Sequence, residues 1–348
     1  MIVRPAFFLV LCIGMISLTQ WGHSYYKSGG ITEKISQAAV SFVDLLQESQ
    51  KNKAVLPIDS PQLQDWQIVP KETRKGLQLN EMNDEQRQAA SSLLRSVLSD
   101  IGYRKTTQIM QMENLLKELE ASRKNGPIRD YTRYYFTIFG SPQSNQKWGL
   151  SIEGHHMSLN FLMDGNRVIS STPQAFAANP AIVRNENASV PVGTRILRYE
   201  ETVAFELVQS LSDAQRSIAV IAETAPREMR TLGLPQPTPE PMVGIPYSKL
   251  TGPQQDLLKR LVDEYISSVP EEIAEDRRQT IATAGGWDSI HFSWEGALQP
   301  GTGHAYRVQG ATFLIEFVNT QPDAAGNVAN HVHCLWRDIR GDFGVSLK

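Results

Sequence analysis

The sequence predicts an α+β protein in which helices pack on an antiparallel sheet. Segments with helical periodicity and clear capping signals come before two stretches in which short strands alternate with turns. One strand-and-turn stretch also recurs in weak form near the C-terminus, which could reflect internal duplication of a helix-plus-sheet unit. With 348 residues, 41% of them hydrophobic, the chain can bury one large core or two medium ones.

The N-terminal residues 1–24 have the pattern of a signal peptide. Arg4 precedes an apolar run over residues 6–18, which is too short to cross a bilayer comfortably, and Gly22-His23-Ser24 offers small residues for cleavage. We therefore expect export, to the periplasm or the extracellular space. The alternative is an uncleaved anchor, which is the only reading that would place the protein at a membrane.

The rest of the chain divides into two parts in this prediction. Residues 25–80 form an N-terminal amphipathic helix (31–50) and a proline-containing loop (53–75). Residues 81–348 form the globular domain. It would contain two related halves, about 81–195 and 250–348, joined by helices and a proline-rich connector at 234–246.

Helix starts are marked by a repeated signal in which Asn, Ser or Thr is followed three residues later by Gln. Such a pair forms a capping box, and it occurs at Asn83, Ser212 and Thr251. The predicted helices continue to about 98 and then cover 107–123, 197–210, 213–224 and 253–269. The predicted strands cover 134–139, 148–153, 156–163, 167–171, 289–294, 305–309, 313–319 and the histidine segment at 330–338.

The weak repeat aligns residues 148–161 with residues 304–317. In this alignment Glu316 takes the place of Asn160, and the Gln-Gly-Ala-Thr sequence at 309–312 takes the place of Glu-Gly-His-His at 153–156. Only one half carries the imidazoles, so the sequence predicts one asymmetric site and not two equal copies.

Histidines mark the predicted site. His331 and His333 lie two residues apart, so a strand presents both on one face, as pairs of metal ligands often are. His155 and His156 form the second pair, and we expect one of them to be a ligand and its neighbour to support it or lie in the core. The implied cofactor is a divalent metal ion. Zinc fits most simply, with copper, iron and manganese also compatible.

Other polar residues near these motifs are candidates for the chemistry. Glu316, in an apolar strand, and Glu153 could act as metal ligand or general base, because an unpaired buried carboxylate is costly. Arg337 could bind an anionic substrate group, or pair with Asp338 or Asp342. A second set of residues shares one strand and could form a substrate-facing wall: His304, Tyr306 and Arg307.

Several function classes are disfavoured. A net charge of −3 gives no electrostatic case for binding nucleic acid. The sequence contains no G-x-S-x-G elbow, P-loop, G-x-G-x-x-G or H-E-x-x-H motif. Cys334 points away from the histidines on its strand and reads as a buried apolar residue, not as a nucleophile.

Taken together, these motifs resemble the DUF3500 family of uncharacterised proteins. The resemblance covers the chain from about Gln86 onward and implies no activity. It rests on Trp148, the Glu-Gly-His-His motif at 153–156, Ser158 to Asn160, His304 to Arg307, Ile315-Glu316, the Asn-His-Val-His-Cys segment at 330–334, Trp336 to Asp338 and Asp342 to Gly344.

The residues thus predict an exported protein with a histidine-rich metal site, acting as a metal-dependent hydrolase on a small-molecule or polymeric substrate. The alternative is a non-catalytic protein that binds a metal or another ligand. A copper or iron redox enzyme is a third reading. An open coordination position would favour the enzyme, and a closed four-ligand site would favour the binding role.

Overall fold

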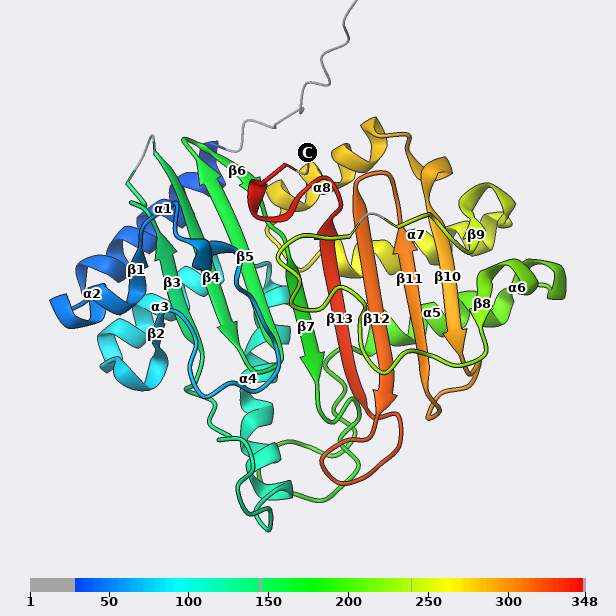
Figure 1. Cartoon of the computed structure of the whole chain (residues 1–348), viewed down its shortest axis with the longest axis horizontal. Coiled ribbons are helices and arrows are strands. Elements are labelled where there is room, and N and C mark those ends of the chain that lie inside the picture. The colour runs from blue at the N-terminus through cyan, green and yellow to red at the C-terminus, as the bar shows by residue number, and fades with distance from the viewer. Residues whose placement is uncertain (1–28, 144–145, 239, 347–348) are drawn as a thin grey trace, which may run out of the picture.

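In the computed structural model, which describes residues 29–143, 146–238 and 240–346, one open sheet forms the centre of the molecule. Helices cover one face of this sheet, while long loops run across the other face (Figure 1). The sheet contains 13 strands within the described residues and is mostly antiparallel. The predicted α+β class is confirmed.

The helices of the described residues differ widely in length. None is long and apolar enough to cross a membrane. They are α1 (Gly29–Asp44), α2 (Glu48–Ala54), α3 (Asp84–Ser96), α4 (Asp100–Leu119), α5 (Arg198–Ser210), α6 (Asp213–Ala219), α7 (Gly252–Ile266) and α8 (Glu271–Thr283).

The strands follow the order β1-β3-β4-β5-β7-β13-β12-β11-β10-β8 across the sheet, with β2, β6 and β9 attached to β3, β5 and β10. Their bounds are β1 (Val55–Leu56), β2 (Leu77–Gln78), β3 (Tyr135–Phe139), β4 (Lys147–Gly154), β5 (Met157–Asp164), β6 (Arg167–Ser170), β7 (Gln174–Ala178), β8 (Val220–Ala222), β9 (Ile245–Pro246), β10 (His291–Gly296), β11 (His304–Gln309), β12 (Phe313–Gln321) and β13 (His331–Asp338).

The two halves of the sheet meet at a seam, the antiparallel pair β7 and β13, in which Phe176 lies opposite Cys334. On each side of the seam the strands follow one another in the same chain order, from β3 through β5 and from β10 through β12. A short parallel strand ends each side, β1 and β8. The predicted sequence duplication itself stays a prediction.

Each half also carries the same arrangement of capped helices. The side-chain amides of Gln50 and Gln86 form two reciprocal hydrogen bonds. Gln50 Nε2 donates to Gln86 Oε1 at 3.0 Å, and Gln86 Nε2 donates to Gln50 Oε1 at 2.8 Å. Gln254 and Gln215 exchange the equivalent bonds at 2.8 and 3.1 Å. The capping boxes predicted at Asn83, Ser212 and Thr251 are present, and α2 has one more at Gln47.

Most apolar side chains pack between the sheet and the helices, in one large core that includes Val332, Cys334 and Trp336 of β13. The opposite face of β13 carries His333, Leu335 and Arg337. A smaller core lies there, where Trp66 and Met229 from the two crossing loops cover Leu335 and its neighbours. Because the loops bury this face, polar side chains on it need partners inside the protein.

Some predicted elements were wrong. The strand β7 lies where we expected irregular chain, because alanines and flanking prolines give a weak strand signal. Helix α8 was not predicted, since its mostly polar residues lack a clear apolar stripe. A helix was predicted over 213–224, but helix α6 ends at Ala219 and the next residues form strand β8. The predicted signal peptide lies outside the described residues.

Candidate metal centre

Strand β13 presents two imidazoles at the seam of the sheet. His331 and His333 lie at the beginning of β13 and share the face that the loops cover. The two-residue spacing predicts that they share one face. His333 is buried, whereas His331 is only partly buried. The neighbouring strands β7 and β12 hold this segment on both sides, so the backbone that carries the two rings is rigid.

The third imidazole comes from the tight turn between β4 and β5. His156 has a φ of +66°, the left-handed region, so it leaves the strand alternation that the sequence suggested. Two backbone bonds fix it: its amide donates to Ile68 O at 2.8 Å, and its carbonyl accepts from Ala177 N at 2.9 Å. The residue before the turn, Gly154, has to be glycine, because a Cβ at this position would lie 2.3 Å from the Tyr134 ring.

The three rings direct their Nε2 atoms toward a common point. His331 Nε2 lies 3.0 Å from His156 Nε2 and 3.0 Å from His333 Nε2. Two nitrogens that bind a tetrahedral zinc ion at 2.0–2.1 Å are about 3.3 Å apart. Small movements of the rings would therefore suffice for coordination. Among the described residues no carboxylate or thiol joins these three nitrogens as a fourth ligand.

A carboxylate orients the His333 ring through the nitrogen that faces away from the cluster. Glu228 Oε1 lies 2.8 Å from His333 Nδ1, which places the proton of this ring on Nδ1 and leaves the Nε2 lone pair free toward the cluster. The bond to His333 also lowers the pKa of Glu228, against the effect of its burial. Carboxylates that accept from the distal nitrogen of a histidine ligand are a usual feature of zinc sites.

The imidazoles of His156 and His331 are held neutral. Burial, together with the neighbouring imidazoles, lowers the pKa of His156 well below its usual value. Burial and His333 lower the pKa of His331 to about 3. Neutral imidazole is the form that binds a metal ion, so the environment that disfavours protons leaves the lone pairs available near pH 7.

His155 supports the cluster from the side. Its ring packs against that of His156, with 3.7 Å between ring centroids and 32° between planes, and its Nδ1 lies 2.5 Å from Glu113 Oε1 on α4. The guanidinium of Arg129 lies 3.0 Å from the same nitrogen and also pairs with Glu120 at 2.8 Å. The sequence left open which of the two adjacent histidines joins the pair on β13, and the structure places His156 there.

A cavity of about 570 Å³ reaches His155, next to the cluster. Glu113 and His155 line it, together with Arg74 and Tyr134. Burial raises the pKa of Glu113 to about 7, with Arg129 opposing the shift. A carboxyl group that titrates near neutral pH and lines a cavity is able to take up or release a proton there.

The two carboxylates proposed from the sequence are engaged elsewhere. Glu316 accepts from the backbone amides of Thr231 (3.1 Å) and Arg230 (3.3 Å), and from the Thr231 hydroxyl. Glu153 pairs with Lys75 at 2.8 Å. Neither belongs to the group of atoms gathered around the three histidines.

Arg337 has the structural pairing that the sequence offered as an alternative. It is fully buried, its Nε donates to Asp342 at 2.5 Å, and its two Nη atoms donate to Thr231 O and Leu234 O at 2.8 Å. This side chain ties the 223–244 loop to the end of the sheet.

The predicted substrate wall does not lie beside the cluster as one surface. His304 is stacked between Trp294 and Phe317 in the core under the helices, with its Nδ1 2.8 Å from Thr302 O. The hydroxyl of Tyr306 donates to Glu200 O at 2.9 Å in the same core. Arg307 lies on the other face and pairs with Glu240 at 2.6 Å.

Sequence reasoning missed three residues next to the histidines. Glu113 stands on α4 at a helical position, and its only signal is a charge on a face that is otherwise buried. Glu228 and Arg129 lie in irregular segments without periodicity, so no local pattern could select them. Each becomes visible only when the fold brings it to a histidine.

The fold and the cluster define an α+β protein whose three converging histidines could hold a metal ion. The chain belongs to the family described as Protein of unknown function (DUF3500), which matches residues 28–345. No curated protein and no solved structure matches the chain.

Proposed function

We propose that His156, His331 and His333 bind one divalent metal ion, zinc in the simplest case, and that the protein is a metal-dependent hydrolase. The three-ligand set carries this proposal. Structural zinc sites are closed by four protein ligands, whereas catalytic sites keep one position for water or substrate. Here three nitrogens converge, and no fourth protein ligand is present among the described residues.

In this proposal the ion supplies an acidified water molecule, with a pKa near 7, at its open position. The protein supplies the geometry. Glu228 fixes the orientation of His333 through the 2.8 Å contact, and the rigid turn fixes His156. Glu113 and His155, at the cavity beside the cluster, form a pair that can hold or pass a proton during the reaction.

The predicted export fits a hydrolase that acts on material outside the cytoplasm, and it belongs to the same proposal. The apolar N-terminal run is its support. N-terminal sequencing of the protein recovered from a secreting host would show whether the chain begins near residue 25.

The burial of His156 and His333 supports a second candidate, a non-catalytic metal-binding protein. An ion held mostly inside the protein would be retained well, and His331 and Glu228 are the less buried members of the site. Metal content alone does not separate the two candidates, so activity must be measured as well.

The first experiment measures metal content. The purified protein, stripped and then dialysed against zinc, should retain about one ion per chain by elemental analysis. His333→Ala and His156→Ala should retain far less, while His291→Ala, a change on β10, serves as the matched control. Equal and negligible zinc in the wild type and in the ligand variants would refute the metal centre.

The second experiment measures hydrolysis. The zinc-loaded protein is assayed with chromogenic carboxylic and phosphoric esters, with and without dipicolinate as chelator. A hydrolase loses activity with the chelator and regains it with zinc, and His333→Ala abolishes the activity. Stoichiometric zinc without hydrolysis of any ester would favour the binding protein.

A further inference from the structure

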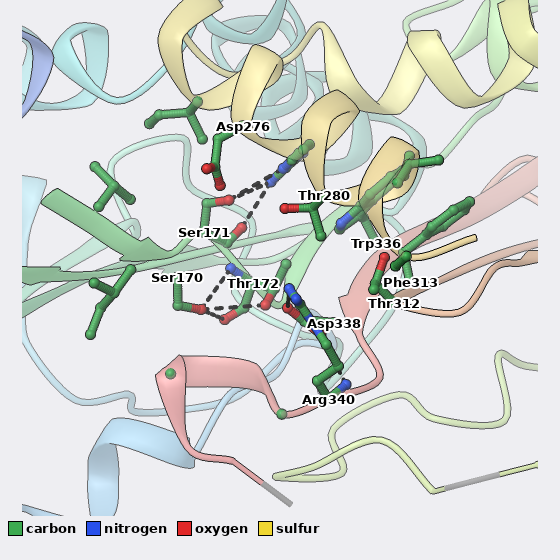
Figure 2. Close-up of a pocket in the computed structure, with 18 of the residues that line it drawn as sticks. Ser170, Ser171, Thr172, Asp276, Thr280, Thr312, Phe313, Trp336, Asp338 and Arg340 are labelled. Atoms are coloured by element: carbon green, nitrogen blue, oxygen red, sulfur yellow. Dashed lines mark hydrogen bonds and ion pairs between the residues drawn. The ribbon is translucent and has the colours of Figure 1, made fainter. Parts of the chain in front are cut away.

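A second polar cavity, of about 580 Å³, lies at the opposite end of the seam from the histidines. Its walls come from the end of β6 and the residues after it, from α8, from the turn between β11 and β12, and from the end of β13 (Figure 2). Asp338 on its wall is five residues beyond His333 on the same strand, which corresponds to about 17 Å. The cavity is therefore separate from the metal centre.

A buried cation lines this cavity. Arg277 on α8 is 7% exposed, and it makes no ion pair within 4.0 Å with a carboxylate of the described residues. Its guanidinium donates to neutral oxygens, those of Ser171 (2.9 Å) and Gln174 (3.0 Å), and lies 5.2 Å from the centre of the Trp336 ring. Asp276 and Asp338 act on this charge only from beyond ion-pair distance, and burial still lowers the pKa of Arg277. An anion placed closer to the guanidinium would therefore be favoured.

Unused hydrogen-bond donors surround the same space. Trp336 lines the cavity and is 3% exposed, and its indole N–H makes no hydrogen bond to a described residue although it is not a fully buried atom, so it is open to the cavity. The hydroxyls of Thr280 and Thr312 also have no hydrogen bond to a described residue. Thr280, Trp336 and Thr312 come from three different elements and lie near one another beside this space (Figure 2). An occupant that accepts hydrogen bonds would satisfy these donors.

The remaining wall of the cavity is apolar, so a matching ligand needs an apolar part as well as a charged group. Trp336 stacks on Phe313 with 4.7 Å between ring centroids and 5° between planes. Ile169, Ile273 and Ile281 add aliphatic surface. A cavity of this size with a few directed polar groups has the character of a small-molecule site.

We propose that this cavity binds a small organic monocarboxylate. Its carboxylate accepts from the Trp336 indole and the threonine hydroxyls in the field of Arg277, and its apolar body packs against Phe313 and the isoleucines. A singly charged group fits better than a phosphate, because the cavity offers one buried cation and is also lined by carboxylates, those of Glu272, Asp276 and Asp338.

The test uses phenylacetate as the probe and isothermal titration calorimetry of the full protein as the measurement. Phenylacetamide, which has the same body without the charge, should bind at least about tenfold more weakly. Inorganic phosphate should not compete. Because the cavity lies far from the histidines, zinc-loaded and metal-free protein should bind phenylacetate equally, so this result does not depend on the proposed hydrolase.

Two variants locate the site. Trp336→Phe keeps the stacking ring but removes the indole N–H, and it should weaken phenylacetate binding about five- to tenfold. Trp287→Phe, at a tryptophan that does not line the cavity, is the matched control and should bind as the wild type does. Arg277→Lys keeps the charge without the planar fork and should also weaken binding, while thermal melting checks that each variant folds.

Several results would overturn the proposal. Equal affinity for phenylacetate and phenylacetamide would show that charge plays no part. Unchanged binding in Trp336→Phe would place the ligand elsewhere, and tighter binding of phosphate would replace the carboxylate by a different class of anion. Failure of phenylacetate, benzoate and hexanoate alike to bind below about 10 mM would refute a carboxylate site.

Discussion

The two ends of the seam are built from corresponding elements but present opposite chemistry. At one end the turn between β4 and β5, helix α4 and the start of β13 bring together His156, Glu113 and His331. At the other end the turn between β11 and β12, helix α8 and the chain entering β7 bring together Thr312, Arg277 and Ser171.

The comparison shows how one framework can carry two different sites. Each turn begins with a glycine that an aromatic ring approaches closely, Tyr134 at Gly154 and Phe313 at Gly310. The residues after these glycines differ, and so does the side chain that the neighbouring helix contributes. Soft nitrogen donors gather at one end, and a cation with hydroxyls gathers at the other, so the ends attract a metal ion and an anion respectively.

The largest expected effect concerns metal removal. If zinc binds the histidine end, free zinc at a thousand times its dissociation constant stabilises the fold by about 4 kcal/mol. Chelation should lower the melting temperature of the wild type accordingly. His331→Ala should melt at the same temperature with and without zinc, while Trp336→Phe, at the other end of the seam, should keep the full zinc effect. If both variants lost the zinc-dependent rise in melting temperature equally, zinc binding would not be specific to the histidine end of the seam.

The next effect is a pH dependence at Glu113. Its pKa is raised from 4.5 to about 7, so the folded state binds this proton more tightly than the unfolded state does. The stability of the wild type relative to Glu113→Gln should therefore be greatest below pH 4.5 and fall as the pH rises toward 7. The total change is up to about 3 kcal/mol. Urea unfolding at a series of pH values measures it.

Glu118→Gln on the same helix is the control for this pH dependence. The pKa of Glu118 is lowered by hydrogen bonds from Ser189 and Ala188, so its contribution to stability has the opposite sign and is lost as the pH falls. A Glu113 variant with the same pH profile as the wild type would show that this carboxyl is not perturbed.

A third prediction compares the halves away from their sites. Gln86→Ala and Gln254→Ala each remove one side of a reciprocal glutamine pair and one capping interaction, so each should cost about 1–2 kcal/mol. Similar losses in urea unfolding would show that the halves share one mechanism of stabilisation. A loss confined to one variant would show that the likeness of the halves is geometric only.

The smallest expected effect is that of Trp336→Phe on stability. The indole N–H has no partner among the described residues, so its removal forfeits no hydrogen bond, and the phenyl ring retains much of the stacking on Phe313. The melting temperature should change by only a few degrees, an effect of about 1 kcal/mol. A much larger loss would mean that the indole is needed to fill the core.

Local sequence patterns predicted those features that depend on neighbours in the chain. The capping boxes follow from residues three apart, and the shared face of His331 and His333 follows from the alternation of a strand. The choice between His155 and His156 could not be predicted, because a left-handed residue in the turn breaks that alternation.

Features that depend on distant contacts had no such pattern. Glu228 reaches His333 across 105 positions of the chain, and Glu113 reaches His155 across 42. Strand β7 is stabilised by partners on both sides and not by its own alanine-rich sequence. Arg277 and Trp336 meet only because α8 packs over the end of β13.

The placement of β7 has a consequence for any attempt to divide this protein. That strand comes from the middle of the chain but lies between β5 and the C-terminal strand β13, so a truncated product ending before residue 331 would leave its hydrogen-bonding edge bare. Such a product should self-associate, and soluble material should form only when both pieces are produced together in the same cell. Neither half is an independent building block, even though each repeats the layout of the other.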